Sequence, residues 1–269
     1  MADQSDVEEA LVSIASLALY PNGIGEPSVP GPDCRIYRGW PNSAALDADL
    51  AAGKINVTVF QAGTTARTTT RFAEQWMGEP GQPTLIATVS GTSVTFGGTA
   101  TLGQVAGIMV DGTSYAYRTR PGDTPQMVAA SLAAMARDRA IVRLSHGTLS
   151  IPGAGILVAR VAADADVKQE VRRQEQGFRI ICWCPTPASR DAATAAIDEA
   201  LSGRRTLQLA DGTRGVLSYG GTTVFDQSQN ARLYRRDLTY SVEYATTVSS
   251  RRSSMLFGNL VVNTSPYTA

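Results

Sequence analysis

The chain has 269 residues, 43% hydrophobic and 18% charged, which is enough apolar material for a hydrophobic core and excludes wholesale disorder. Basic and acidic side chains number 24 each, so a net charge of +0 gives no overall attraction to nucleic acid or to an anionic membrane. No apolar run approaches the roughly 20 residues that cross a bilayer, and the acidic start is unlike a secretory signal. Three cysteines, an odd count, argue against a disulfide framework. We expect a protein made in a cytoplasm.

An amphipathic helix is predicted near the start of the chain. Ser5 and Glu8 have the spacing of a capping box, and apolar residues follow at helical spacing over 6–19. Residues 21–33 hold four prolines and three glycines, which predicts an extended surface loop.

Two strands and a second helix are predicted next. Residues 34–40 predict a short strand, and Asn42 predicts the N-cap of a helix that ends at Gly53. Residues 55–60 alternate and predict a strand with positions 55, 57 and 59 inward. Residues 61–83 are polar and threonine-rich without periodicity, and they end in a glycine- and proline-rich run at 78–83 that is interpreted as a linker.

The composition changes over residues 84–164, which contain no cysteine and no tryptophan. Short β-type runs alternate with turns, and Asp111-Gly112 has the form of a two-residue hairpin loop. Thr124 predicts the N-cap of a helix that continues to about Arg137. These features indicate a compact α+β module with its own core.

We interpret residues 84–164 as an accessory domain inserted into a loop of an outer domain. The outer domain then consists of residues 1–83 and 165–248, and residues 249–269 form a C-terminal tail of the kind that often docks on a neighbouring subunit. Insertion at an exposed polar loop is tolerated in many proteins. The alternative is two consecutive domains, which leaves the first 80 residues with a thin core.

The second half of the outer domain gives the clearest signals. Residues 178–184 predict a strand that is apolar on one face and nearly so on the other, and it leads into an alanine-rich helix that ends at Gly203. Residues 220–231 are predicted to be a polar loop, and residues 234–244 alternate as a long final strand. The expected fold class is α+β: an antiparallel sheet packed by helices, with an inserted small β-rich α+β domain.

The residues needed for catalysis are missing from the sequence. The single histidine, His146, falls in a predicted hairpin turn, and no Gly-x-Ser-x-Gly nucleophile pattern exists. Cys182 and Cys184 share one strand face and Cys34 stands alone, which favours core thiols over a zinc site. We therefore expect no catalytic residue, no cofactor and no metal, and a protein that is not an enzyme.

Arginines cluster in the outer domain and its tail. The clusters include pairs at 172–173 and 204–205, and the candidate interface residues are Arg232, Arg235, Arg236, Arg251 and Arg252. One interpretation is a solvated face; the other is contact with an acidic protein surface or with DNA that passes nearby. The sequence shows no interleaved stacking aromatics and no groove-reading helix, so sequence-specific nucleic-acid binding is not expected.

The order of predicted elements resembles that of the tail-terminator and tail-completion (neck) proteins of tailed bacteriophages, over about residues 6–76 and 167–248. The stretches that carry this resemblance are 7–11, 35–41, 177–200 and 234–244. The inserted segment, with its 110–117 hairpin, is similar to the small decoration-type modules of phage structural proteins.

The resemblance implies a structural virion protein that assembles with itself into a ring, expected to be a hexamer, at the head-proximal end of the tail. Such a ring would end tube polymerisation and contact the tail-tube protein, the sheath where the tail has one, and a head-completion or neck protein. It would also make non-specific contact with passing DNA and none with membrane. The candidate arginines would line an interface or the channel. Alternatives are a baseplate or tail-tube subunit, or a carbohydrate- or surface-binding module with residues 84–164 as the binder.

Overall fold

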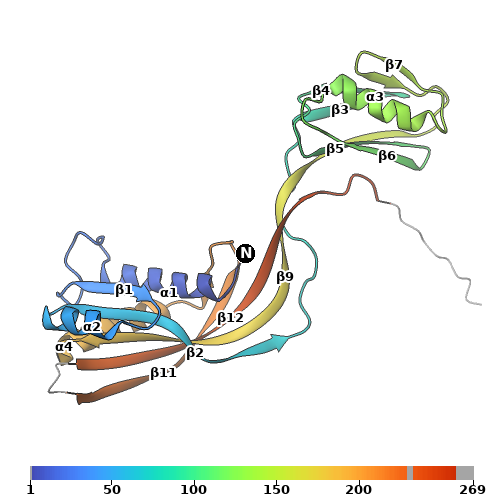
Figure 1. Cartoon of the computed structure of the whole chain (residues 1–269). Helices are drawn as coiled ribbons and strands as arrows, with labels where there is room; N and C mark the ends of the chain where they lie inside the picture. The colour runs from blue at the N-terminus through green and yellow to red at the C-terminus, as the bar shows by residue number, and fades with distance from the viewer. Residues whose placement is uncertain (1, 229–232, 259–269) are drawn as a thin grey trace, which may run out of the picture. The chain divides into compact units, whose positions relative to one another are not determined.

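The structure is a computed structural model that describes residues 2–228 and 233–258 (Figure 1). It has the expected α+β class: four helices, a mixed curled sheet and a separate small antiparallel sheet within the described residues. The chain divides into two compact units. Unit 1 combines Met1–Trp76 with Gln169–Val248, and unit 2 combines Met77–Lys168 with Ser249–Ala269. The expected insertion at 84–164 lies inside unit 2, and the tail from residue 249 belongs to unit 2 as well.

Unit 1 is built on a sheet with the strand order β1-β2-β9-β12-β11-β10. The strands are β1 (Cys34–Arg38), β2 (Ile55–Thr69), β9 (Leu157–Cys184), β12 (Leu233–Ser253), β11 (Arg214–Ser228) and β10 (Thr206–Gln208). The β1–β2 pair is parallel and so departs from the expected antiparallel arrangement. A helix in the connection between the two strands gives the chain the length it needs to return in the same direction.

Helices cover both faces of this sheet. α1 (Gln4–Leu19) and α4 (Pro187–Ser202) pack on one face, where the predicted inward side chains of the strands are buried. This main core includes Val7, Leu11, Ile55, Val57, Val59, Phe178, Ile180, Cys182, Ile197, Leu238 and Tyr240. α2 (Ser43–Ala51) packs on the other face through Leu46 and Leu50, against Ile181 and Trp183.

The start of α1 differs from the prediction. Asp3, and not Ser5, is the N-cap, because its carboxylate accepts from the Ser5 backbone N–H while Asp6 accepts from the Asp3 backbone N–H. Glu8 is instead buried and accepts a hydrogen bond of 3.0 Å from Arg38. The Asn42 cap of α2 is confirmed, since its side chain accepts from the backbone of Ala44 and Ala45.

Three strands run much further than predicted. β2 continues to Thr69 into the threonine-rich segment that lacks periodicity, and β11 continues to Ser228 through the expected polar loop. β9 extends the predicted strand at 178–184 back to Leu157, for a total of 28 residues. The polar composition of the added parts of β2 and β11 reflects solvent exposure on both faces, and threonine remains a good strand residue there.

Unit 2 contains the small sheet β3-β4-β8-β7 and a hairpin that pairs with the start of β9. The sheet strands are β3 (Leu85–Ser90), β4 (Ser93–Gly98), β8 (Thr148–Ser150) and β7 (Arg143–Ser145). The hairpin strands are β5 (Gln104–Val110) and β6 (Thr113–Arg118), and α3 (Pro125–Ala136) packs against both parts. The predicted hairpin turn is confirmed, because Asp111 and Gly112 both have positive φ, 45° and 84°. Thr124 is the N-cap of α3, as predicted.

None of the helices in the described part of the chain has the length and apolar character to span a membrane.

Candidate assembly surfaces

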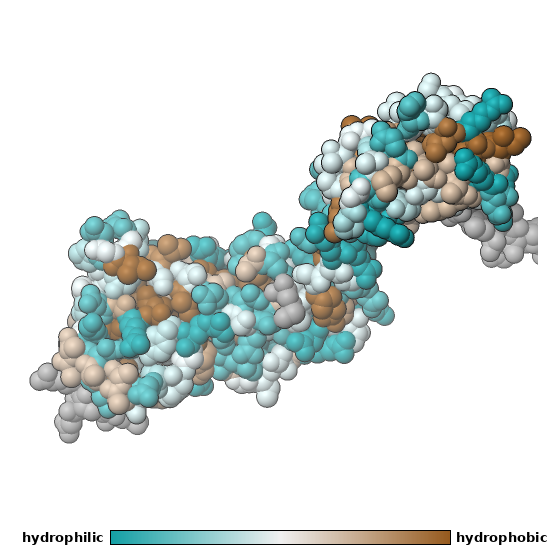
Figure 2. Space-filling model, turned by 45° about the horizontal axis from the view of Figure 1, so that its top comes forward, coloured by the Kyte–Doolittle hydropathy of each residue, from teal (hydrophilic) through white to brown (hydrophobic). Residues whose placement is uncertain are grey.

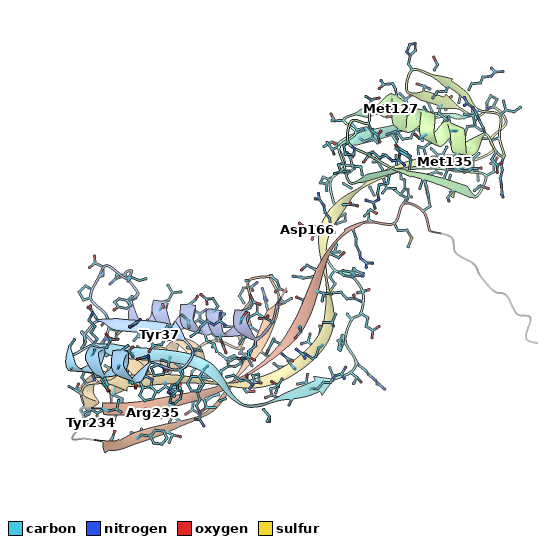
Figure 3. All side chains as sticks on the ribbon, in the orientation of Figure 1. Tyr37, Met127, Met135, Asp166, Tyr234 and Arg235 are labelled. Atoms are coloured by element: carbon cyan, nitrogen blue, oxygen red, sulfur yellow. The ribbon has the colours of Figure 1, made fainter. Side chains whose placement is uncertain are left out.

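Arg235, on β12, lies in an aromatic cluster on the α2 face of the unit 1 sheet (Figure 3). Its guanidinium carbon is 4.7 Å from the ring centroids of both Trp183 and Phe225, and 5.8 Å from that of Trp40. Trp40 also packs edge-on against Phe60 and Trp183, at centroid distances of 5.2 and 5.6 Å. The cluster joins the loop after β1 to β9, β11 and β12.

A carboxylate completes the environment of Arg235. Asp237 stands two residues further on the same strand face and accepts two hydrogen bonds of 2.6 Å, from Nε and Nη2 of Arg235. The exposed side-chain fractions are 19% for Arg235 and only 4% for Asp237. These two charge-assisted hydrogen bonds hold the guanidinium and the carboxylate together inside unit 1. Arg235 is therefore part of the packing of unit 1, and its expected role at an interface stays a prediction.

The other candidate arginines are not gathered into one site with Arg235. Arg236 points to the opposite face of β12, half-buried, and its Nε donates to Thr222 at 3.0 Å. Arg251 and Arg252 are exposed at the end of β12, in the part of the strand that belongs to unit 2. Arg232 lies outside the described residues.

The sheet of unit 1 has an open edge along β2. β1 pairs only with Ile55 to Val59, so no described strand pairs with the outer side of β2 from Phe60 to Thr69. This stretch carries one charge, Arg67, and neither proline nor lysine. A register shift between Ala62 and Ala66 bends it.

A second open edge runs along β11 at the other end of the strand order. β10 covers only Arg214 to Val216, so within the described residues the outer side of β11 has no partner strand from Ser218 onward. Three large side chains on the unpaired stretch beyond Ser218 are well exposed: Tyr219 at 54%, Val224 at 46% and Phe225 at 40%. Long edges with exposed apolar side chains and few charges are the ones to which another strand adds.

The three cysteines lie in the main core region, as predicted for core thiols. Burial raises the pKa of the Cys182 thiol to about 12, and burial also raises the pKa values of Cys184 and Cys34. Such thiols stay protonated and unreactive at neutral pH. Within residues 2–228 and 233–258, no three His, Cys, Asp or Glu side chains converge into a metal site.

Unit 2 exposes apolar side chains of its own, and hydrophobic residues appear on its visible surface (Figure 2). On α3, Met127 and Met135 are 50% and 37% exposed (Figure 3). Nothing in the described chain shows what would cover this helix face.

His146 has the positive φ of 51° that its predicted turn position requires.

Comparison with protein families finds no family model that matches the chain, and comparison with curated proteins finds no relative. The geometry of the two sheet edges is therefore the main guide to function.

Sequence reasoning missed these edges because it found no periodicity in residues 61–83 and assigned 220–231 to a loop. A signal was present in the sequence: threonines recur within 61–69, and Val224 and Phe225 follow two threonines in the other stretch, all residue types that favour strands. The Arg235–Asp237 pair also had a signal, since opposite charges two residues apart lie on the same face of a strand.

Proposed function

We propose that the chain is a ring-forming structural protein of a bacteriophage virion, a tail terminator that ends tube growth and joins the tail to the head or neck. The observation that carries the proposal is the pair of open edges on the unit 1 sheet, β2 from Phe60 to Thr69 and β11 from Ser218 onward. The resemblance in element order supplies the biological setting.

The two edges differ in sequence and lie at opposite ends of the strand order, so they support head-to-tail contact. In that contact β11 of one copy pairs with β2 of the next. Head-to-tail contacts produce a closed ring when the rotation closes and an open filament when it does not. A closed ring leaves neither edge free, so the two long edges cannot pair with other chains and aggregate. We expect six copies, made in the bacterial cytoplasm and then built into the virion.

The partners in this proposal are the last ring of the tail-tube protein, the sheath where the tail has one, and a head-completion or neck protein. DNA that passes through the ring would meet its inner wall without sequence recognition. Among the described candidate arginines, Arg251 and Arg252 are the exposed ones and are proposed to meet such a partner.

A single charge on the β11 edge tests the proposal. Val224→Glu places a carboxylate where an added strand would bury it, while Arg236 stands directly across the ladder on β12 and can pair with it in the monomer. We expect the variant to stay folded and to lose ring formation, measured as mass in solution by light scattering.

The matched control is Val171→Glu. Val171 is 43% exposed, close to the 46% of Val224, but it lies on β9, which is neither of the two edges proposed to pair between copies. This variant should form rings like the unmodified chain. Equal ring formation by both variants would contradict assembly through the β11 edge.

A further inference from the structure

The loop between α1 and β1, residues 20–33, projects from unit 1 and displays apolar side chains in solvent (Figure 1). Ile24 is 82% exposed and Val29 is 52% exposed. The loop is held at its base, because the Val29 N–H donates to the Leu19 carbonyl oxygen at 2.9 Å. Two further backbone hydrogen bonds close turns before and around Ile24. An ordered loop loses little conformational entropy on binding, so Ile24 is a preformed apolar knob.

A groove of about 410 Å³ lies on the same unit, between α1 and β10. Its apolar lining comes from Ala10 and Ile14 of α1, and from Leu207 and Leu209 on and just after β10. Among the described residues, none from the loop lines the groove of its own copy. The groove is larger than an isoleucine side chain, so it has room for a knob of the size and apolar character of Ile24.

The charges beside the knob and beside the groove are opposite. Glu26 lies two residues after the knob, and Arg204 lines the groove. Within the described chain neither side chain has an ion-pair partner, and Arg204 Nε donates to a backbone carbonyl oxygen at 3.2 Å. The two carboxylates that also line the groove, Asp6 and Glu9, already interact with groups at the start of α1 and on β1. Arg204 is therefore the lining charge that a carboxylate from outside can pair with.

The loop and the groove belong to opposite ends of the strand order. The loop leads into β1 at one end, and the groove borders β10 at the other. An apolar knob and a complementary groove elsewhere on the same surface produce a head-to-tail contact between copies. This is the same sense of contact as the one proposed above for the β2 and β11 edges.

We propose that the groove between α1 and β10 is a docking site for the loop 20–33 of a second copy, with Ile24 seated in the groove and Glu26 paired with Arg204. This inference rests on the ring proposed above and adds a second link between copies, separate from the sheet edges. Each copy is then held to its neighbour by an edge strand and by this loop.

Disulfide trapping in the full chain tests the contact. The double variant Ser13→Cys/Ile24→Cys places one thiol in the groove and one on the loop, and both positions are exposed. After mild oxidation of the assembled ring, we expect a ladder of covalently joined chains that reaches the size of the ring on a non-reducing gel. Each single variant should remain at the mass of one chain. The matched control is Val171→Cys/Ile24→Cys, which should give no ladder, because Val171 is 43% exposed but lies on β9 and does not line the groove.

Substitutions at the same positions test the chemistry of the contact. Ile24→Asp should raise the concentration at which half of the rings dissociate by about 10- to 100-fold, because it removes the burial of one aliphatic side chain. Glu26→Arg and Arg204→Glu should each raise it by about two- to tenfold, since each replaces an ion pair by like charges. The double variant Glu26→Arg/Arg204→Glu restores the pair in reverse and should recover most of the loss. All three positions are exposed, so far-UV circular dichroism of each variant should match that of the unmodified chain.

The outcomes separate the loop contact from the ring itself. Rings that trap no bond, or only bonds within one chain, would overturn the loop contact and leave the ring intact, as would unchanged ring stability in Ile24→Asp. Two weakened single charge variants without recovery in their double variant would overturn the pairing of Glu26 with Arg204. A chain that is monomeric before oxidation would overturn the proposed ring and this contact with it.

Discussion

Replacement of Arg235 by methionine is expected to destabilise unit 1 strongly. The change removes the two 2.6 Å hydrogen bonds to Asp237, whose side chain is only 4% exposed. Removing one partner of a buried ion pair typically costs about 3–5 kcal/mol, because the other charge stays buried. The lost cation–π contacts with Trp183 and Phe225 are worth about 0.5–2 kcal/mol, and methionine recovers part of this by apolar contact. We expect a loss of about 3–4 kcal/mol in the free energy of unfolding.

The assay is urea unfolding followed by tryptophan fluorescence. All three tryptophans, Trp40, Trp76 and Trp183, belong to unit 1, so the signal reports that unit. Because the Trp183 ring contacts the substituted side chain, its fluorescence can change without unfolding. Unfolding is therefore also followed by far-UV circular dichroism, which does not depend on that ring alone.

Two further variants make the test discriminating. The double variant Arg235→Met/Asp237→Leu should recover most of the loss, because an apolar replacement of both partners is often close to neutral. Arg236→Met, one residue away, should cost about 0.5 kcal/mol or little more, since it removes one partly exposed hydrogen bond. A loss below about 1 kcal/mol for Arg235→Met, or no recovery in the double variant, would refute the structural role of the pair.

Three more predictions concern the cores. Burial raises the pKa of Cys182 to about 12 from an ordinary 9.0, so the thiol ionises in the unfolded chain before it does in the folded one. The free energy of unfolding should therefore be constant below about pH 8 and fall as the pH rises from 9 towards 12. Cys182→Ala should reduce this fall when unfolding is measured across the pH range. Ellman's reagent at pH 8 should label Cys182 only after denaturation; rapid labelling of the native chain would contradict its burial. Leu132→Ala should destabilise unit 2 by about 2–5 kcal/mol, seen as faster hydrogen exchange in α3, and an unchanged exchange rate would be inconsistent with the core position of Leu132.

Periodicity predicted the elements that bury one face. The strand at 178–184, the helix that ends near Gly203 and the inward positions 55, 57 and 59 all occupy the main core as expected. In unit 2 the turn at Asp111-Gly112 and the cap at Thr124 were also predictable, because each depends on a local backbone requirement.

The remaining features depend on distant partners. Residues 61–69 form a strand because they pair with β9, more than 100 positions away in the chain, and alternation is weak where both faces meet solvent. The aromatic neighbours of Arg235 come from three separate segments, at Trp40, Trp183 and Phe225. The close approach of Leu256 and Phe257 to Gly107 likewise depends on residues far away in the chain.

The most direct measurement of the central claim is negative-stain electron microscopy of the purified full chain, with its mass in solution determined on the same sample. Pairing of β11 with β2 between copies predicts discrete closed rings of uniform copy number that do not stack into tubes. A monomer at every concentration, or open filaments of variable length, would contradict it.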